Sequence, residues 1–198
     1  MTGGEDSDER LVARAGEGDR AAAGALVLRH TDRIFAASYR MLGDRSAAED
    51  ATQETFLRLW KHAARWKPQG AKFETWLYRV AMNICLDRLR RRGRERPEEE
   101  APERADIAPL ADERIEQRQR RAVVEEALAA LPERQRAAIT LCHYQELSNI
   151  EAAAALEISV EALESLLARG RRALRERLSP RRAELMEGAR HDASPLSL

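Results

Sequence analysis

The sequence is poor in residues that interrupt helices and in long apolar stretches. Only ten glycines and seven prolines occur in 198 residues, and the dominance of alanine, leucine, arginine and glutamate favours helix throughout. No apolar run exceeds about five residues, which is too short to span a membrane. The first ten residues are acidic and lack the apolar segment of a secretory signal. These features predict an all-α, cytoplasmic protein that does not insert into membranes.

Cysteine and histidine are also scarce. The two cysteines, Cys85 and Cys142, lie far apart, which excludes a disulfide framework or a zinc site built from cysteine pairs. The four histidines show no ligand spacing, and the adjacent Cys142 and His143 lack the geometry of a nucleophile and its base. No glycine-rich phosphate loop is present. We therefore expect no metal, no cofactor, no small-molecule substrate and no catalytic residues, and we interpret Cys142 as a small core residue.

Charge is segregated along the chain, although 34 basic and 34 acidic residues cancel overall. Residues 58–96 hold 12 basic and three acidic side chains, a net charge of +9. Residues 98–116 have a net charge of −6 and contain two of the seven prolines, whereas residues 169–182 have a net charge of +6. Two basic regions therefore flank an acidic stretch that is too polar to form a core. This pattern favours a polyanionic partner.

The pattern predicts two small helical domains joined by a flexible linker. The predicted segments are an acidic tail (1–9), an N-terminal domain (10–95), an acidic, proline-containing linker (96–116), a C-terminal domain (117–179) and a tail (180–198). In the N-terminal domain, apolar spacing predicts helices over Leu11–Ala15, Arg20–Met41, about Arg45–Trp66, and about Glu74–Arg92, ending before Gly93. In the C-terminal domain it predicts Arg118–Leu131, Glu133–Gln145 with Pro132 in the first turn, and then two short helices.

The C-terminal domain contains the outline of a helix-turn-helix motif within Leu147–Leu178. Ser148 and Glu151 form a capping-box pattern, and Ser159 can cap a second helix after a three-residue turn. The predicted buried stripe of that helix is Val160, Leu163, Leu167 and Leu174. The other face carries Glu161, Ser165, Ala168 and Arg172, with Arg169, Arg171 and Arg175 at its edges. This arrangement favours duplex DNA binding; the alternative is a helical hairpin that merely packs.

Five of the nine aromatic residues lie between positions 60 and 78, and lysines and arginines alternate with them. The aromatic residues are Trp60, Trp66, Phe73, Trp76 and Tyr78, and the basic ones are Lys61, Arg65, Lys67, Lys72 and Arg79. Rings that stack on bases and cations that follow phosphates are typical of single-strand binding and of pockets for an extruded base. The alternative is that the rings form core, which we favour for Trp60 and Phe73.

The helix that follows carries a polar stripe made of Trp76, Arg79, Asn83, Asp87 and Arg90. Its opposite face is apolar: Leu77, Val80, Ala81, Ile84 and Cys85. The stripe is therefore exposed or part of a binding surface, and the Asn83 amide is suited to reading a base edge. Asp87 is unusual on a DNA-binding face, and its spacing predicts an ion pair with Arg90 or Arg91.

A third stripe lies within Asp44–Trp60. Asp50, Gln53, Glu54 and Leu57 share one face of the predicted helix, opposite a core face of Ala48, Thr52, Phe56 and Leu59. An acidic, amide-bearing face suits a protein partner that offers arginines. The alternative is an ordinary solvated face.

These motifs together resemble the extracytoplasmic-function group of the bacterial sigma-70 family of RNA polymerase sigma factors. The resemblance covers about residues 10–178. It is carried, in order, by LVARAGEGDRAAAGALVLRH, AEDATQETFLRLW, FETWLYRVAMNICLDRLRR, and LAALPERQRAAITL followed by the helix-turn-helix. It implies a factor, typically stress-responsive, that binds core RNA polymerase and directs promoter-specific initiation. It also implies control by a separate anti-sigma protein and a linker that threads through the polymerase.

The resemblance assigns roles to particular residues. Asp50, Gln53, Glu54 and Leu57 would contact core polymerase. The loop Lys67–Phe73 would hold a base flipped from the promoter −10 element, and the −10 contacts would be Lys67, Lys72, Phe73, Trp76, Arg79, Asn83 and Arg90. The −35 element would be contacted by Ser165, Arg169, Arg171 and Arg172. Elements two helical turns apart are separated by ~70 Å, a distance that two linked domains on a large partner can span.

Three positions depart from the family pattern. Glu157 lies in the turn where the family commonly has glycine, and Glu164 and Leu166 replace a basic residue and a frequent arginine of the reading helix. We hypothesise that the Glu164 carboxylate accepts a hydrogen bond from a cytosine amino group.

Two other function classes compete with the sigma-factor interpretation. A conventional dimeric helix-turn-helix regulator would explain residues 147–178 but not the other two motifs, and no heptad seam is evident. A small nucleic-acid hydrolase needs clustered carboxylates or histidines that the sequence lacks.

Overall fold

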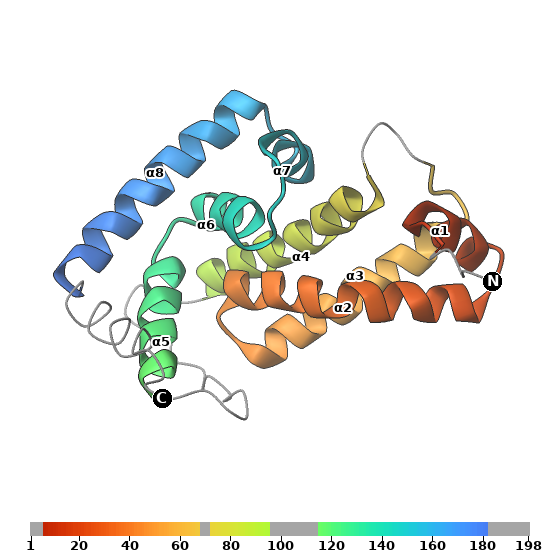
Figure 1. The fold of residues 1–198 in the computed structure, drawn as a ribbon, viewed down its shortest axis with the longest axis horizontal. Coiled ribbons are helices and arrows are strands. Elements are labelled where there is room, and N and C mark those ends of the chain that lie inside the picture. The colour runs from red at the N-terminus through yellow and green to blue at the C-terminus, as the bar shows by residue number, and fades with distance from the viewer. Residues whose placement is uncertain (1–5, 68–71, 96–114, 182–198) are drawn as a thin grey trace, which may run out of the picture.

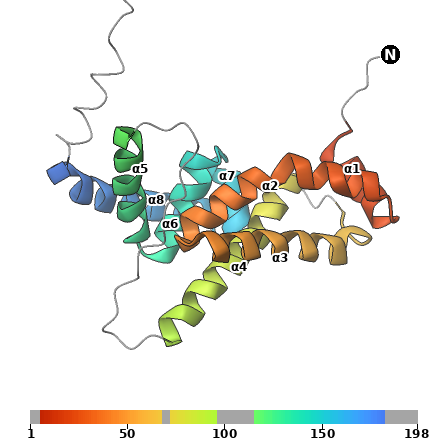
Figure 2. The same ribbon diagram turned by 90° about the horizontal axis from the view of Figure 1, so that it is seen from below.

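The structure, a computed structural model, describes residues 6–67, 72–95 and 115–181, and no strand occurs within these ranges. The described helices form two lobes (Figures 1 and 2). The N-terminal lobe contains α1 (Asp8–Gly16), α2 (Arg20–Leu42), α3 (Arg45–Ala63) and α4 (Phe73–Glu95). The C-terminal lobe contains α5 (Ile115–Ala129), α6 (Glu133–Ile139), η1 (Thr140–Tyr144), α7 (Asn149–Leu156), α8 (Val160–Leu178) and η2 (Ser179–Arg181). The predicted all-α, two-domain architecture is confirmed. No described helix is long and apolar enough to cross a bilayer.

Short polar side chains begin the first three helices. Ser7 Oγ accepts a hydrogen bond from the Arg10 amide, and Asp19 accepts two at the start of α2. Asp44 caps α3 directly after Gly43, whose positive φ of 67° ends α2 in the left-handed conformation that glycine adopts without steric cost. These caps fix where each helix begins and so set the relative positions of α2 and α3.

The core of the N-terminal lobe is built from the apolar faces that the sequence predicts. Ala48, Thr52, Phe56 and Leu59 are buried on α3, as are Leu77, Ala81, Ile84 and Cys85 on α4. Val80, predicted for the same apolar face of α4, is only partly buried. A close approach supports this packing: a Cβ atom at Gly16 would lie 2.8 Å from the backbone of Ala64. The end of α1 therefore rests directly against the end of α3.

Several predicted boundaries differ from the structure. Helix α1 begins at Asp8 rather than Leu11, because Ser7 supplies a cap that extends it. Helix α4 continues through Gly93 to Glu95, because a single glycine within a helix costs only about 1 kcal/mol. The segment predicted as one helix over Glu133–Gln145 is α6 followed by the π-helical turn η1, and Pro132 precedes α6 as its N-cap residue. The segment 68–71, most of the predicted linker and residues 182–198 lie outside the described residues.

The two lobes are in direct contact, which the sequence did not predict. Helix α4 packs against α7, and α2 packs against α5, α6 and η1. Buried hydrogen bonds cross the contact: Arg136 donates to the Met41 carbonyl oxygen across 2.6 Å, and the Tyr78 hydroxyl donates to Gln145 Oε1 across 2.7 Å. Burial raises the pKa of Tyr78 to about 12, so its hydroxyl remains a donor throughout the physiological pH range.

Candidate nucleic-acid interface

A cationic groove of about 580 Å³ lies where the end of α3 meets the first turns of α4. Its polar walls carry five basic side chains and one amide: Arg58, His62, Arg65, Lys67, Arg79 and Asn83. Trp66 and Trp76 add two aromatic faces. Cations beside exposed ring surface are the combination that a single-stranded nucleic acid requires.

The two groove tryptophans pack on a third ring, that of Phe73, Trp66 edge-to-face and Trp76 stacked. Phe73 lies beneath Trp66 and Trp76, with ring centroids 5.7 Å and 6.1 Å away, and its side chain is 1% exposed. His30 contacts Phe73 from α2 at 5.5 Å and is itself held by Asp8 through a 2.9 Å hydrogen bond. Phe73 therefore cannot stack on a base, which corrects its assignment as a DNA contact. It supports the two tryptophans that can.

The structure brings together only some of the other residues predicted for the −10 element. Lys67, Trp76, Arg79 and Asn83 all line the groove. Lys72 is exposed but forms an ion pair with Glu151 of α7. Arg90 lies further along α4, outside the groove lining, where it pairs with Asp87 at 3.3 Å as the helical spacing predicted.

Three groove residues, Arg58, His62 and Arg65, were not among those predicted to contact the −10 element. The three side chains line the groove from the last turns of α3 and the residues just after it. Their spacing of four and three residues is that of one helix face, although α3 itself ends at Ala63 before Arg65. Helical periodicity could therefore have grouped them, but only the packing of α3 on α4 shows which groove that face borders.

The α3 stripe predicted to contact a protein partner is largely exposed, although Asp50 lies 3.6 Å from the guanidinium of Arg88. Asp50, Gln53 and Leu57 are exposed, and the Leu57 side chain is 58% exposed, an unusual degree for leucine. Glu54 is half-buried and accepts hydrogen bonds from Arg58 (2.6 Å) and Arg88 (3.2 Å). Burial alone raises the pKa of Glu54, but these two hydrogen bonds outweigh it and lower the pKa. The stripe thus presents an exposed leucine beside two carboxylates, whose charges Arg58 and Arg88 partly balance.

The helix-turn-helix motif is present as predicted. Ser148 and Glu151 form the reciprocal capping box at α7, and Ser159 Oγ accepts from the Ala162 amide at the start of α8. Leu163 and Leu167 are buried, and Ser165, Arg169, Arg171 and Arg172 are all exposed. The face of α8 that a major groove would receive is therefore open.

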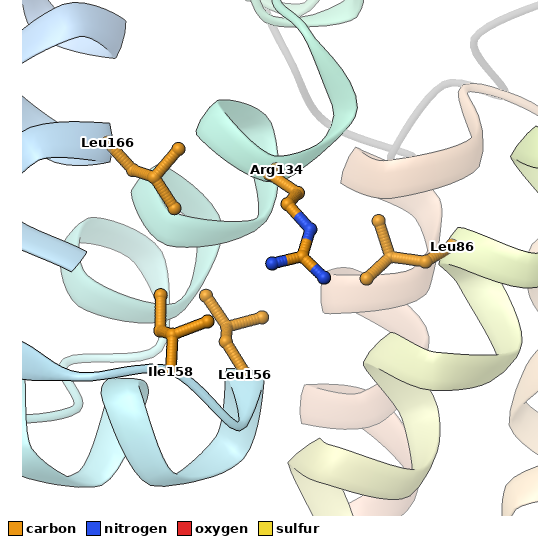
Figure 3. A pocket seen from close by; sticks show the side chains of 5 residues that line it. All are labelled: Leu86, Arg134, Leu156, Ile158 and Leu166. Atoms are coloured by element: carbon orange, nitrogen blue, oxygen red, sulfur yellow. The ribbon is translucent and has the colours of Figure 1, made fainter. Parts of the chain in front are cut away.

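The two unusual residues of α8 have different environments. Glu164 is exposed and accepts a 3.4 Å hydrogen bond from the Asn149 side-chain amide of α7. Leu166 instead points toward the N-terminal lobe and lines a small apolar cavity of about 10 Å³ with Leu156, Ile158, Arg134 and Leu86 of α4 (Figure 3). Leu166 therefore packs in the contact between the two lobes, whereas the exposed carboxylate of Glu164 can still contact DNA.

The side chains that could bind a metal ion or react as thiols are histidine, cysteine, aspartate and glutamate. Among the described residues, no group of three or more of them could hold a metal ion. Both cysteines are free, and burial raises the pKa of Cys85 to about 11. Burial also raises the pKa of the partly buried Cys142.

Two segments of the chain match models of known protein families. Residues 26–95 match the family model described as sigma-70 region 2, and residues 117–174 match sigma-70, region 4. The chain belongs to the extracytoplasmic-function (ECF) group of sigma-70 factors. Sigma factors are transcription initiation factors rather than enzymes. The α3 stripe and the groove-lining residues of α3 and α4 lie in region 2, whereas Ala154, which also lines the groove, and the helix-turn-helix motif lie in region 4.

Individual ECF sigma factors are similar over most of the chain. SigE of Mycolicibacterium smegmatis is 38% identical over 83% of this chain, which spans 64% of the SigE length. The RNA polymerase sigma-H factor of Pseudomonas aeruginosa is 31% identical, with 89% of this chain and 96% of that protein covered. SigW of Bacillus subtilis is 30% identical, with coverages of 86% and 96%.

Solved structures show the same fold. CnrH, solved in complex with the cytosolic domain of CnrY, superimposes with a TM-score of 0.68 at 28% identity, covering 88% of this chain and 99% of CnrH. The sigma factor RpoE of Bartonella quintana, solved with the anti-sigma factor NepR, gives a TM-score of 0.66 at 24% identity, with coverages of 79% and 96%.

Proposed function

We propose that this ECF sigma factor binds core RNA polymerase in the cytoplasm, opens promoters at a −10 element and selects them through a −35 element. The observation that carries the proposal is the pairing, within one lobe, of the exposed α3 stripe with the cationic, aromatic groove at the end of the same helix. The protein-binding stripe and one wall of the groove both belong to α3, so their relative position is fixed. When the stripe binds polymerase, the groove is therefore brought to the promoter DNA.

The polymerase surface is centred on Leu57, with Asp50 and Gln53 beside it. A largely exposed leucine can bury its side chain in a partner, while the carboxylate and the amide bind cationic and polar groups at the rim. Glu54 contributes from a fixed position because Arg58 and Arg88 hold its carboxylate.

The −10 strand is held in the groove by two kinds of contact. The basic side chains Arg58, Arg65, Lys67 and Arg79 neutralise phosphates, and each such contact makes binding weaken as salt concentration rises. Trp66 and Trp76 provide the faces on which unstacked bases rest. The Asn83 amide lies on the groove wall, where it can donate to and accept from a base edge.

The −35 element is read by α8 in the major groove. Ser165, Arg169, Arg171 and Arg172 supply a short polar group and three cations on the exposed face of that helix. Arginine is the side chain most suited to guanine edges and to phosphates. The Glu164 carboxylate, which lies on the same helix, suits the amino group of a cytosine.

A related structure suggests how the activity of this chain is controlled. CnrH was solved with the cytosolic domain of CnrY, and this chain covers 99% of CnrH at 28% identity. We propose that a separate anti-sigma protein covers the polymerase-binding surface of this chain until a stress signal releases it. A pull-down from unstressed cells should recover that protein, and recovery should fall when Leu57 is changed to alanine.

Transcription in vitro from fragmented genomic DNA, with core polymerase and with or without this protein, tests the function. Discrete new transcripts that need both components are expected, and their start sites define both promoter elements. Failure of initiation, combined with specific retardation of duplex DNA by the protein alone, would instead establish the conventional helix-turn-helix regulator.

A matched pair of variants tests the groove. Replacing Trp76 with alanine removes a stacking face, so promoter opening should fall by roughly tenfold while affinity for core polymerase is unchanged. Arg94, exposed on the same helix but outside the groove lining, is the control; Arg94→Ala should open promoters as the parent does. Equal opening by both variants would contradict the assignment.

A further inference from the structure

Helix α1 lies N-terminal to the region 2 match but touches the rings and the chain that form the groove. That match begins at residue 26, whereas α1 covers Asp8–Gly16. The helix packs against α2, α3 and α4 at the end of the lobe where α3 ends and α4 begins (Figure 1). Its two ends make separate contacts with that region.

The N-terminal end of α1 reaches the rings through a buried histidine. Asp8 Oδ2 lies 2.9 Å from Nε2 of His30, which is 5% exposed. Since a carboxylate only accepts hydrogen bonds, Nε2 carries the proton, and this bond fixes the orientation of the imidazole ring. The other oxygen, Oδ1, accepts a 2.5 Å hydrogen bond from Arg29. Both oxygens of the Asp8 carboxylate are therefore held by α2.

His30 in turn holds the ring that supports the two groove tryptophans. Its imidazole meets the Phe73 ring at an interplanar angle of 67°. Trp76 stacks on Phe73 at 28°, and Trp66 meets it edge-on at 83°. A buried ring with neighbours on three sides cannot turn without displacing them, because protein interiors are close-packed. The path from Asp8 through His30 and Phe73 therefore sets the planes of both tryptophans.

The C-terminal end of α1 contacts the chain just before Trp66. A Cβ atom at Gly16 would lie 2.8 Å from Cα of Ala64 and 2.9 Å from the carbonyl carbon of Ala63. The Trp66 amide donates a 3.2 Å hydrogen bond to the Ala63 carbonyl oxygen. Because Gly16 has no side chain, α1 can approach the turn from which Arg65 and Trp66 enter the groove lining.

We propose that Asp8 and His30 are positioning residues of the −10 groove, which act through Phe73 to set the planes of the two groove tryptophans. Gly16 fixes the turn before Trp66 from the other end of α1. This inference rests on the proposed function of the groove. The three residues lie outside the groove lining. They act by preorganisation, because faces that are already aligned bind a base with a smaller ordering cost than mobile ones.

Near-UV circular dichroism tests the positioning without DNA, since aromatic side chains give a near-UV signal only when their packing is fixed. The measurement uses the full chain with Trp60→Phe, which leaves Trp66 and Trp76 as the remaining tryptophans. Asp8→Ala removes the acceptor of His30, so the tryptophan signal should be partly lost while the far-UV spectrum is unchanged. Asp8→Asn keeps an oxygen acceptor and should restore the signal.

Glu9→Ala is the matched control, because Glu9 is the other acidic residue in the first turn of α1. It removes the same charge from the same helix terminus and should leave the near-UV spectrum unchanged. An Asp8→Ala spectrum identical to that of the parent would refute the positioning role, as would an equal loss of signal in Glu9→Ala.

Promoter opening by the reconstituted holoenzyme measures the consequence for function. On a promoter mapped by transcription, Asp8→Ala should reduce opening roughly fivefold, less than the removal of a stacking face would. Affinity for core polymerase should be unchanged, and Asp8→Asn should open the promoter as the parent does. These two results separate a positioning role from general damage to the fold.

A glycine pair tests the other end of α1. Gly16→Ala must displace the backbone at Ala64, so it should also reduce opening several-fold. Gly24→Ala is its control, because Gly24 is exposed on α2 and an added Cβ would meet no atom within 4 Å. It should open promoters as the parent does, and equal losses in both variants would contradict the role of Gly16.

The Trp76→Ala variant separates this inference from the proposed function. If Trp76→Ala impairs opening but Asp8→Ala and Gly16→Ala do not, the positioning is refuted and the groove assignment stands. If Trp76→Ala leaves opening unchanged, the groove assignment is wrong, and the near-UV spectra alone decide whether Asp8 orients the two tryptophans.

Discussion

The guanidinium of Arg136, on α6 of the C-terminal lobe, donates a 2.6 Å hydrogen bond to the carbonyl oxygen of Met41 near the end of α2. The same side chain donates to the carbonyls of Ala129 and Leu131 at the end of α5. Helix C-termini leave carbonyl oxygens without partners inside the helix. One buried arginine thus satisfies such groups in both lobes and joins them.

Replacing Arg136 with methionine should destabilise the folded protein by about 2–3 kcal/mol, because the buried carbonyl oxygens of Met41 and Leu131 lose their donor. Urea unfolding should show a lower midpoint, and the two lobes should unfold less cooperatively. Arg177→Met, an exposed arginine near the end of α8, is the comparison, and equal midpoints for the two variants would contradict the role of Arg136.

Replacing Leu57 with alanine should weaken binding to core polymerase by about tenfold, the factor that corresponds to ~1.4 kcal/mol. Thermal stability should not change, because the side chain is mostly exposed. Leu28 on α2, 86% exposed, offers a control of the same chemistry. Surface-plasmon measurements that found equal losses for both variants would show that the α3 stripe is not the anchor.

Replacing Glu164 with glutamine should change base preference at one −35 position from cytosine toward adenine by roughly tenfold, because an amide both donates and accepts where a carboxylate only accepts. Transcription from a panel of −35 variants by the reconstituted holoenzyme measures this. An unchanged preference profile removes Glu164 from the reading surface and leaves recognition to the serine and arginines of α8.

Replacing Ser148 with alanine removes the hydroxyl that caps α7 and should cost about 1 kcal/mol of stability. The backbone amide of Glu151 loses its acceptor, which lies 3.3 Å away. Chemical denaturation checks the value against Ser46→Ala, an exposed serine in the first turn of α3. A loss no larger than that of the control would mean that α7 does not depend on its capping box.

Cys85 should resist alkylation in the native protein. A pKa near 11 rather than the usual 9.0 means about 100-fold less thiolate below pH 9, since the population falls tenfold per pH unit. The partly buried Cys142 should react first with iodoacetamide at pH 8, as quantified by peptide mass spectrometry, and denaturation should abolish the difference. Faster labelling of Cys85 would mean that α4 opens readily.

Local pattern was enough to predict most elements. Ser148 and Ser159 were predicted as helix caps, and both cap helices in the structure, because capping involves only neighbouring residues. The stripes on α3 and α8 were likewise predictable, since helical periodicity is local. The kinds of partner were also predictable from local sequence. The acidic stripe indicated a protein partner, and the aromatic-basic and arginine-rich segments indicated DNA.

Tertiary packing decided the rest. Phe73 could be assigned to core or surface only once Trp66, Trp76 and His30 surrounded it. Arg58 and His62 joined the groove because α3 packs on α4. The contacts of Arg136 and Gln145 with the other lobe join residues 95 and 67 positions apart. No local pattern encodes such a pairing, because its free energy comes from burial and hydrogen bonding between segments that only the folded chain brings together.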